Sequence, residues 1–153
     1  MAIEPGFCIL ESATLKWPPD LRIPSKRFRL FVAANTTDCT TRVISEFVLA
    51  ALQSGMVYFS AWGPGCSRFH DIVDEELVAD EIGEGVFASP SGHDTIMTTW
   101  HESHTLDEAL DFFIRWTKPD GKFQQGSEYW VAVSVNNPHW AASIRRTMEA
   151  AKT

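Results

Sequence analysis

Four nearly continuous apolar runs alternate with segments of helical hydrophobic spacing, and this alternation restricts the chain to few architectures. The runs lack the polar–apolar alternation of a half-exposed sheet, which indicates strands buried on both faces by covering helices. We expect strands over 28–34, 56–62, 94–100 and 129–135. The sequence therefore predicts a three-layer α/β/α sandwich, flavodoxin/Rossmann-like, with a mainly parallel sheet of about four strands whose order is undetermined.

The helices between these strands have recognisable ends. A helix over about 41–54 is followed by Gly55, the usual residue at a helix C-terminus. Phe112, Phe113 and Trp116 have helical spacing in a later helix, and we assign all three to the core. The other expected elements are a helix from Cys66 or Ser67 to near Ile82 or Gly83, a loop over 85–92, a helix after the capping box Thr105-Leu106-Asp107-Glu108, and a helix from Asn137 to about 151.

The first 25 residues have a different character. They contain four prolines and one short apolar stretch, 7–10. We expect an irregular N-terminal arm over 1–25 that crosses the body of the domain and can add an edge strand. A length of 153 residues fits one domain, so we place a single α/β domain at 26–153.

Several sequence features are those expected of a cytoplasmic protein without a membrane segment. No apolar run reaches the roughly 18 residues that a membrane helix needs, and Glu4, Pro5 and Glu11 lie where a signal peptide would be apolar. The three cysteines are far apart and cannot all pair within one chain. We therefore expect reduced thiols, a cytoplasmic location and no membrane partner.

The net charge of −7 disfavours one class of partner, nucleic acids. Most of the charge comes from residues 74–84, which contain six acidic and no basic side chains. This run is interpreted as a solvated helix face, with docking of a basic partner as the alternative. The candidate partners are a small anionic ligand or another protein, and no cofactor is expected.

Unusual side chains gather after the expected strands. Because parallel strands end at one edge of a sheet, the loops that follow them form the usual ligand site of this architecture. Four of the five histidines and three tryptophans lie in or beside these loops. The sequence therefore predicts a binding or regulatory module with a Trp/His-rich crevice. Its expected ligand-binding residues are Trp62, Gly65, Ser67, Arg68, His70, Trp100, His139 and Trp140.

The segment W-G-P-G-C-S-R-F-H-D, residues 62–71, places a cysteine at a strand–turn–helix junction. The positive end of a helix dipole favours a thiolate. The segment resembles the nucleophile elbow of the DJ-1/PfpI-like and class I glutamine amidotransferase families, although Pro64 and Arg68 stand where an elbow has small residues. The resemblance implies a cysteine-dependent hydrolase or amidotransferase-like enzyme as an alternative function. Its residues would be Cys66 as nucleophile, His101 or His70 as base, and Glu102 or Asp38 to orient that base.

Two further ligands are considered for these loops. The amides of 65–67, with Arg68 beside them, can hold a phosphate or a carboxylate. His101-Glu102-Ser103-His104 has one residue too few for the H-E-x-x-H zinc motif, so no metal is our first expectation. A zinc site through His101, His104 and Cys66 is the alternative.

The loops W-G-P-G-C-S-R-F-H-D and T-T-W-H-E also resemble those of a family of small uncharacterised bacterial proteins, over most of residues 28–140. This resemblance implies no activity. Each catalytic interpretation needs a residue that departs from its motif, and we therefore favour the binding module.

Overall fold

The computed structural model describes residues 2–81 and 95–152. Within these residues, six strands, four α-helices and one short 3₁₀ helix follow one another. In chain order they are β1 (Ala2–Ile3), β2 (Phe7–Ser12), β3 (Phe28–Ala33), α1 (Thr41–Ser54), β4 (Met56–Trp62), α2 (Cys66–Glu81), β5 (Met97–Trp100), α3 (Leu106–Trp116), the 3₁₀ helix Gly121–Gln124, β6 (Trp130–Val135) and α4 (Pro138–Lys152).

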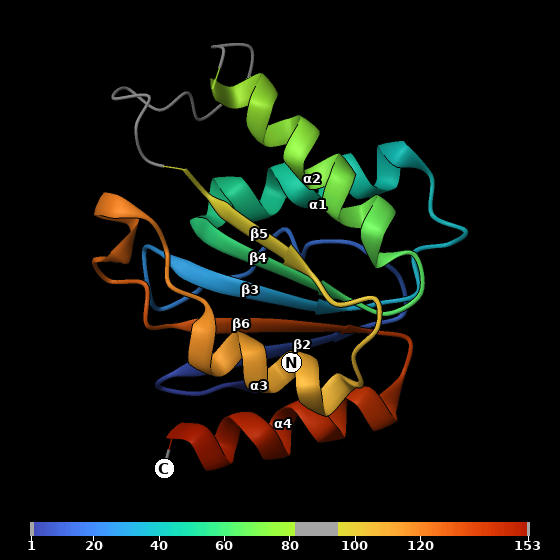
Figure 1. Cartoon of the computed structure of the whole chain (residues 1–153). Coiled ribbons are helices and arrows are strands. Elements are labelled where there is room, and N and C mark those ends of the chain that lie inside the picture. The colour runs from blue at the N-terminus through green and yellow to red at the C-terminus, as the bar shows by residue number, and fades with distance from the viewer. Residues whose placement is uncertain (1, 82–94, 153) are drawn as a thin grey trace.

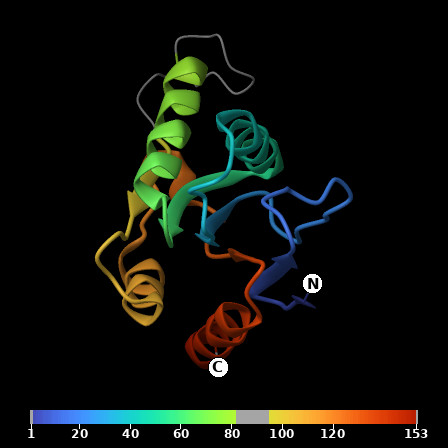
Figure 2. The same ribbon diagram turned by 90° about the vertical axis from the view of Figure 1, so that its right-hand side faces the viewer.

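The strands form one sheet in the order β1-β2-β6-β3-β4-β5. Strands β2 to β6 run parallel, and β1 pairs antiparallel with β2 at the edge. The helices lie in two layers, with α1 and α2 on one face and α3 and α4 on the other (Figures 1 and 2). The predicted three-layer, mainly parallel, Rossmann/flavodoxin-like sandwich is confirmed, and the structure adds the strand order.

The sheet has more strands than the four expected, because the N-terminal arm contributes two of them. Phe7 to Leu10 are buried, and β2 pairs along its whole length with β6. The expectation of an irregular arm was therefore wrong for β1 and β2, although β1 is the kind of edge strand that the arm was expected to add. The apolar stretch 7–10 has β6 on one side and β1 on the other, so β2 is an internal strand.

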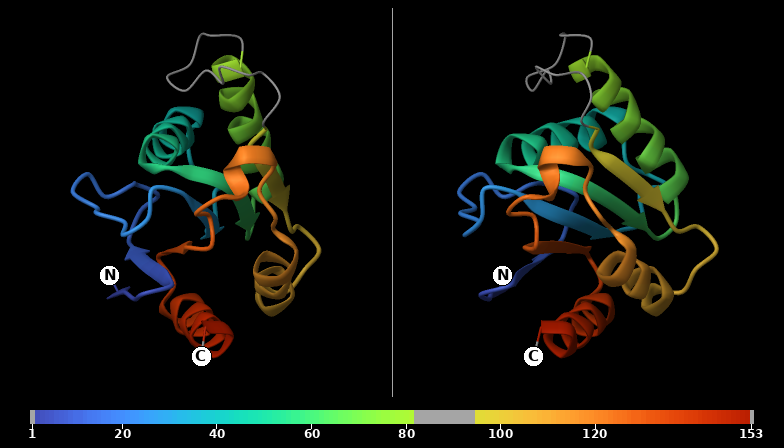
Figure 3. Two further views of the ribbon diagram at one scale, coloured as in Figure 1. Left: turned by 90° about the vertical axis from the view of Figure 1, so that its left-hand side faces the viewer. Right: turned by 60° about the vertical axis from the view of Figure 1, so that its left-hand side comes forward.

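The rest of the arm packs over α1. The Trp17 ring stacks on Phe28 at a centroid distance of 5.7 Å and meets Phe47 of α1 edge-on at the same distance. Leu15 is also buried there. The two views of Figure 3 show this segment beside α1, on the face opposite to α3 and α4.

Local signals place the helix ends where expected. Thr40 caps α1, and Gly55 ends it with φ 114°, a left-handed conformation that favours glycine. At α3, both hydrogen bonds of the capping box between Thr105 and Glu108 are present. Strand β5 is shorter than expected, beginning at Met97. The predicted end of α2 at 82–83 and the loop over 85–92 lie outside the described residues.

Within residues 2–81 and 95–152, every helix is too short or too polar to cross a membrane.

Candidate functional site

The reversal of strand order lies between β3 and β6. Strands β4 and β5 follow β3 on one side of it, whereas β6 lies on the other side. Ligands of parallel sheets usually bind at such a reversal. Two asparagine side chains next to this reversal make hydrogen bonds within their own turns. Oδ1 of Asn35 accepts from the amide and the hydroxyl of Thr37. Oδ1 of Asn137 accepts from the amides of His139 and Trp140 at the start of α4. His139 itself is exposed.

The expected crevice residues divide between the two faces of the sheet. Trp100 is paired with Ala61 in the β4–β5 ladder. Because successive side chains of a strand point to opposite faces, Trp100 lies on the face of Ala61, and Trp62 lies on the other. The structure therefore does not bring the two tryptophans into one hollow.

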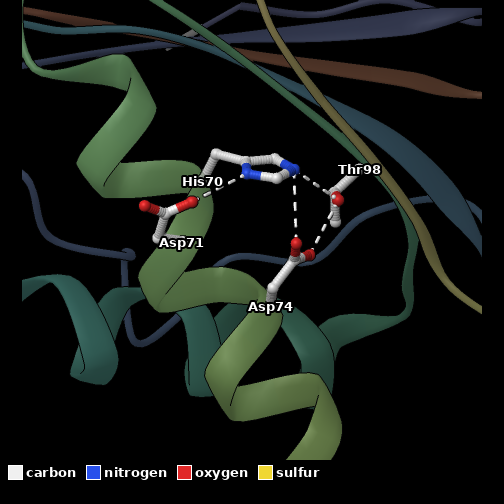
Figure 4. Close-up of polar contacts among 4 residues, drawn as sticks. All are labelled: His70, Asp71, Asp74 and Thr98. Carbon is white, nitrogen blue, oxygen red and sulfur yellow. Dashed lines mark hydrogen bonds and ion pairs between the residues drawn. The ribbon is translucent and has the colours of Figure 1, made fainter.

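On the face of α1 and α2, His70 is the centre of a polar cluster with Asp71, Asp74 and Thr98 (Figure 4). Nε2 of His70 is 2.8 Å from Oγ1 of Thr98 and 3.4 Å from Oδ2 of Asp74. Nδ1 is 3.4 Å from Oδ1 of Asp71. The Trp100 ring, 46% exposed, covers the imidazole at a centroid distance of 4.2 Å.

This cluster resembles an Asp–His–Thr triad in outline, but its protons are arranged differently. The Thr98 hydroxyl donates to Oδ1 of Asp74 at 2.8 Å, so its only proton is directed to a carboxylate. Thr98 is then left to accept from Nε2 of His70. His70 is therefore not placed to remove the Thr98 proton, and the cluster joins α2 to β5.

The turn before α2 packs against the loop that follows β3. A Cβ on Gly65 would lie 2.7 Å from Oγ1 of Thr36, and the Thr36 amide donates to the Pro64 carbonyl at 2.9 Å. Arg68 reaches across to the Thr36 carbonyl at 3.2 Å and to Thr41 Oγ1 at 3.4 Å. The expected anion-binding residues Gly65 and Arg68 thus hold two loops together; Ser67 beside them is half-buried.

Cys66 begins α2, as expected, but its side chain is only 1% exposed. Burial raises the pKa of the Cys66 thiol, hydrogen bonding from the backbone of His101 opposes this, and the charge of exposed Glu102 raises the pKa further. A neutral, covered thiol is a poor nucleophile. Cys66 has the environment of a core residue.

On the face of α3 and α4, Trp62 and Trp140 meet edge-on at a centroid distance of 5.1 Å. The indole N–H of Trp62 donates to the carbonyl of His104 at 2.9 Å, which fixes the loop after β5. Both indole rings are half-buried and pack against the core beneath α3 and α4. The pair closes this end of the α3/α4 layer.

A chain of polar contacts runs from the sheet to the surface in the same region. Oγ of Ser60 is 2.8 Å from Oγ1 of Thr99, which is 3.1 Å from Nε2 of His101. Nδ1 of His101 is 3.1 Å from Nδ1 of exposed His104. Burial and, secondarily, the charge of His104 lower the pKa of His101 to about 4, so His101 is neutral at physiological pH.

The three-residue zinc set considered from the sequence is not assembled. Among the residues that the structure describes, no three His, Cys, Asp or Glu side chains lie close enough to hold one metal ion. His101 and His104 are adjacent, and Cys66 does not join them.

The outer side of α3 has a feature that the sequence analysis missed. A groove of about 440 Å³ runs along the helix, and a second one of about 480 Å³, between α3 and α4, shares Asp107 and Asp111 with it. We call the first the α3 groove; its lining residues are His104, Asp107, Glu108, Asp111, Phe112 and Trp116.

The assignment of Phe112 and Trp116 to the core was wrong. Phe113 is fully buried, but Phe112 is half-buried and Trp116 is 68% exposed. A spacing of four residues relates His104, Glu108, Phe112 and Trp116. This row indicated that the side chains lie along one side of the helix, because residues four apart are neighbours on a helix, but it did not indicate that this side is exposed.

No curated protein and no solved structure matches the chain. A domain of unknown function, DUF7684, matches residues 8–151, from the second residue of β2 to the penultimate residue of α4. The chain therefore belongs to the DUF7684 family.

Proposed function

We propose that the chain is a non-catalytic binding module that recognises a basic segment of a partner protein through the α3 groove. The observation behind this proposal is Trp116, a 68% exposed indole at the end of a groove lined by three carboxylates. Exposed aromatic side chains beside a hollow are common at protein interfaces, where Trp often contributes most to affinity.

The chemistry of the groove favours a cationic occupant. Asp107, Glu108 and Asp111 line it, and its lining contains neither lysine nor arginine among the residues that the structure describes. Arg115 pairs with Asp111 at 2.7 Å from outside the lining, which leaves the other carboxylates as the charged surface. The rings of Phe112 and Trp116 offer faces to which a guanidinium or an ammonium group is attracted. An anionic ligand would be repelled here.

The environment of the candidate catalytic groups also supports binding over catalysis. Cys66 is covered, the Thr98 proton is directed to Asp74, and His101 is buried between Thr99 and His104. In each case the side chain that would react is buried or hydrogen-bonded to another part of the protein. Recognition of a partner by exposed side chains does not require a reactive group.

The test uses a short Lys/Arg-rich peptide as the probe and a Glu-rich peptide of equal length as its counterpart. We expect the basic peptide to bind, to shift backbone NMR signals of α3, and to bind more weakly at high salt. Trp116→Ala should reduce affinity about tenfold or more. Because Trp116 is exposed, the same change should alter the free energy of unfolding by no more than about 0.5 kcal/mol.

A matched pair of double variants separates the groove from general attraction to an acidic protein. Asp107→Asn with Asp111→Asn should weaken peptide binding, whereas Glu75→Gln with Glu149→Gln, exposed carboxylates outside the groove, should not. Equal losses in both double variants, or NMR shifts away from α3, would show that the α3 groove is not the site.

A further inference from the structure

His101 and His104 place two metal-binding atoms face to face. Their Nδ1 atoms are 3.1 Å apart, and their ring centroids are 5.2 Å apart. Two nitrogens that bind one ion at about 2.0–2.1 Å are separated by about 2.9 Å at a right angle and by about 3.4 Å at the tetrahedral angle. The observed separation lies within this range, so an ion can replace the hydrogen bond with only small ring movements.

The groups behind His101 match the usual surroundings of a metal-binding histidine. Such a histidine normally donates its second ring N–H to an oxygen, which orients the ring and directs the other lone pair to the ion. Oγ1 of Thr99 lies 3.1 Å from Nε2 of His101, and Oγ of Ser60 supports Thr99 at 2.8 Å. Thr99 can therefore accept this proton while it donates its own to Ser60.

The two rings differ in exposure in a way that suits an open site. His101 is 4% exposed, and its ring packs on Phe112 at a centroid distance of 4.9 Å, so its position is fixed. His104 is exposed on the loop before α3, which gives an ion access from solvent.

We propose that His101 and His104 bind a divalent transition-metal ion of the zinc class through their Nδ1 atoms. When His104 donates the Nδ1–H···Nδ1 hydrogen bond in the metal-free chain, ion binding displaces this proton from Nδ1 into solvent. A proton from solvent then binds to Nε2 of the same ring, so His104 stays neutral. The described residues supply no third His, Cys, Asp or Glu donor. Water therefore fills the remaining positions, and they are open to a donor atom of a bound partner.

This inference is independent of the proposed function. It depends on imidazole geometry, whereas recognition of a basic segment depends on the carboxylates and on Trp116. His104 is common to both surfaces. Peptide binding without metal binding, or the reverse, tells the two proposals apart.

The experiment titrates Zn²⁺ into the untagged, chelator-treated full chain by calorimetry, with Mg²⁺ as the control ion. We expect one Zn²⁺ per chain and no Mg²⁺ binding, because Mg²⁺ prefers oxygen ligands. His104→Ala should abolish the one-to-one binding, and Thr99→Val should weaken it about tenfold or more. His139→Ala, which removes an exposed histidine outside the pair, should bind Zn²⁺ like the unmodified chain.

Absence of one-to-one Zn²⁺ binding, or equal binding by His104→Ala, would overturn the proposal. A second measurement needs no variant. In the ¹⁵N NMR spectrum of the unmodified chain, the Nδ1 signals of His101 and His104 should shift together on addition of Zn²⁺. Unchanged Nδ1 signals would also overturn the proposal. This result does not depend on whether the substituted chains fold correctly.

Discussion

Trp62 and Trp100 end neighbouring parallel strands, yet their indole rings lie on opposite faces of the sheet. Trp62 contacts Trp140 and the carbonyl of His104, whereas Trp100 covers His70. The carboxyl end of the sheet is therefore divided into two separate surfaces. A small ligand that stacks on one indole has no access to the other.

This division predicts separate responses to substitution. Trp100→Ala should shift NMR signals around His70 and Asp74, and Trp62→Ala should shift those around His104 and Trp140, because the two rings have different partners among the described residues. Backbone ¹⁵N–¹H spectra of the two variants provide the measurement. Extensive overlap between the two sets of shifted residues would contradict the separation.

The three cysteines should differ in their rate of alkylation. Cys66 is buried with a raised thiol pKa, and burial raises the pKa of Cys8 to about 11. Cys39 is half-buried and should react first. Iodoacetamide labelling at neutral pH, followed by mass spectrometry, measures the three rates, with chain unfolded in denaturant as the control. If Cys66 is labelled faster in the folded chain than in the unfolded one, it is an activated thiol and the binding-module interpretation is weakened.

The lowered pKa of His101 predicts acid destabilisation. Its folded-state pKa is about 4 against an ordinary value of 6.5, so the unfolded chain binds a proton that the folded chain does not as the pH falls between these values. The contribution of His101 is fully present above pH 6.5 and is lost toward pH 4. It amounts to roughly 3 kcal/mol of unfolding free energy.

Urea unfolding in metal-free buffer at several pH values measures this loss. Carboxylates titrate in the same range, so the informative quantity is the difference between the unmodified chain and His101→Gln, which lacks the titrating ring. His139→Gln is the control, since His139 is exposed. A pH dependence that is the same in His101→Gln and in the unmodified chain would show that His101 is not held neutral.

Lys152, near the C-terminus, is expected to stabilise the N-terminal part of the sheet. Its Nζ lies 3.9 Å from the Trp130 ring centroid and donates to the Glu128 carbonyl at 3.0 Å. Its side chain also covers Gly6, where a Cβ would lie 2.9 Å from the lysine Cδ. Lys152→Ala should cost about 1 kcal/mol of unfolding free energy, through the lost cation–π contact and the lost packing of the stem.

Denaturant unfolding of Lys152→Ala and Lys152→Arg gives the comparison. Arginine retains the charge above the indole, so that variant should lose less stability than alanine. A loss of equal size in both variants would indicate that the exact shape of the lysine matters more than its charge.

Sequence alone determined the features that depend on neighbouring residues. The capping box of Thr105 and Glu108, the left-handed Gly55 and the start of α2 at Cys66 follow from interactions within one helical turn. The buried character of β3, β4 and β6 follows from their own apolar residues, and it already required helices on both faces.

Only the tertiary structure decided which of these pieces meet. Strand β2 is internal because β6, from the far end of the chain, pairs with it. Trp62 and Trp100 separate because the β4–β5 register pairs Trp100 with Ala61, and a shift of one residue would reverse the face. Trp116 is exposed although Phe113, one turn earlier, is buried. Register, strand order and burial at a helix end depend on contacts between distant segments, and local sequence patterns do not encode them.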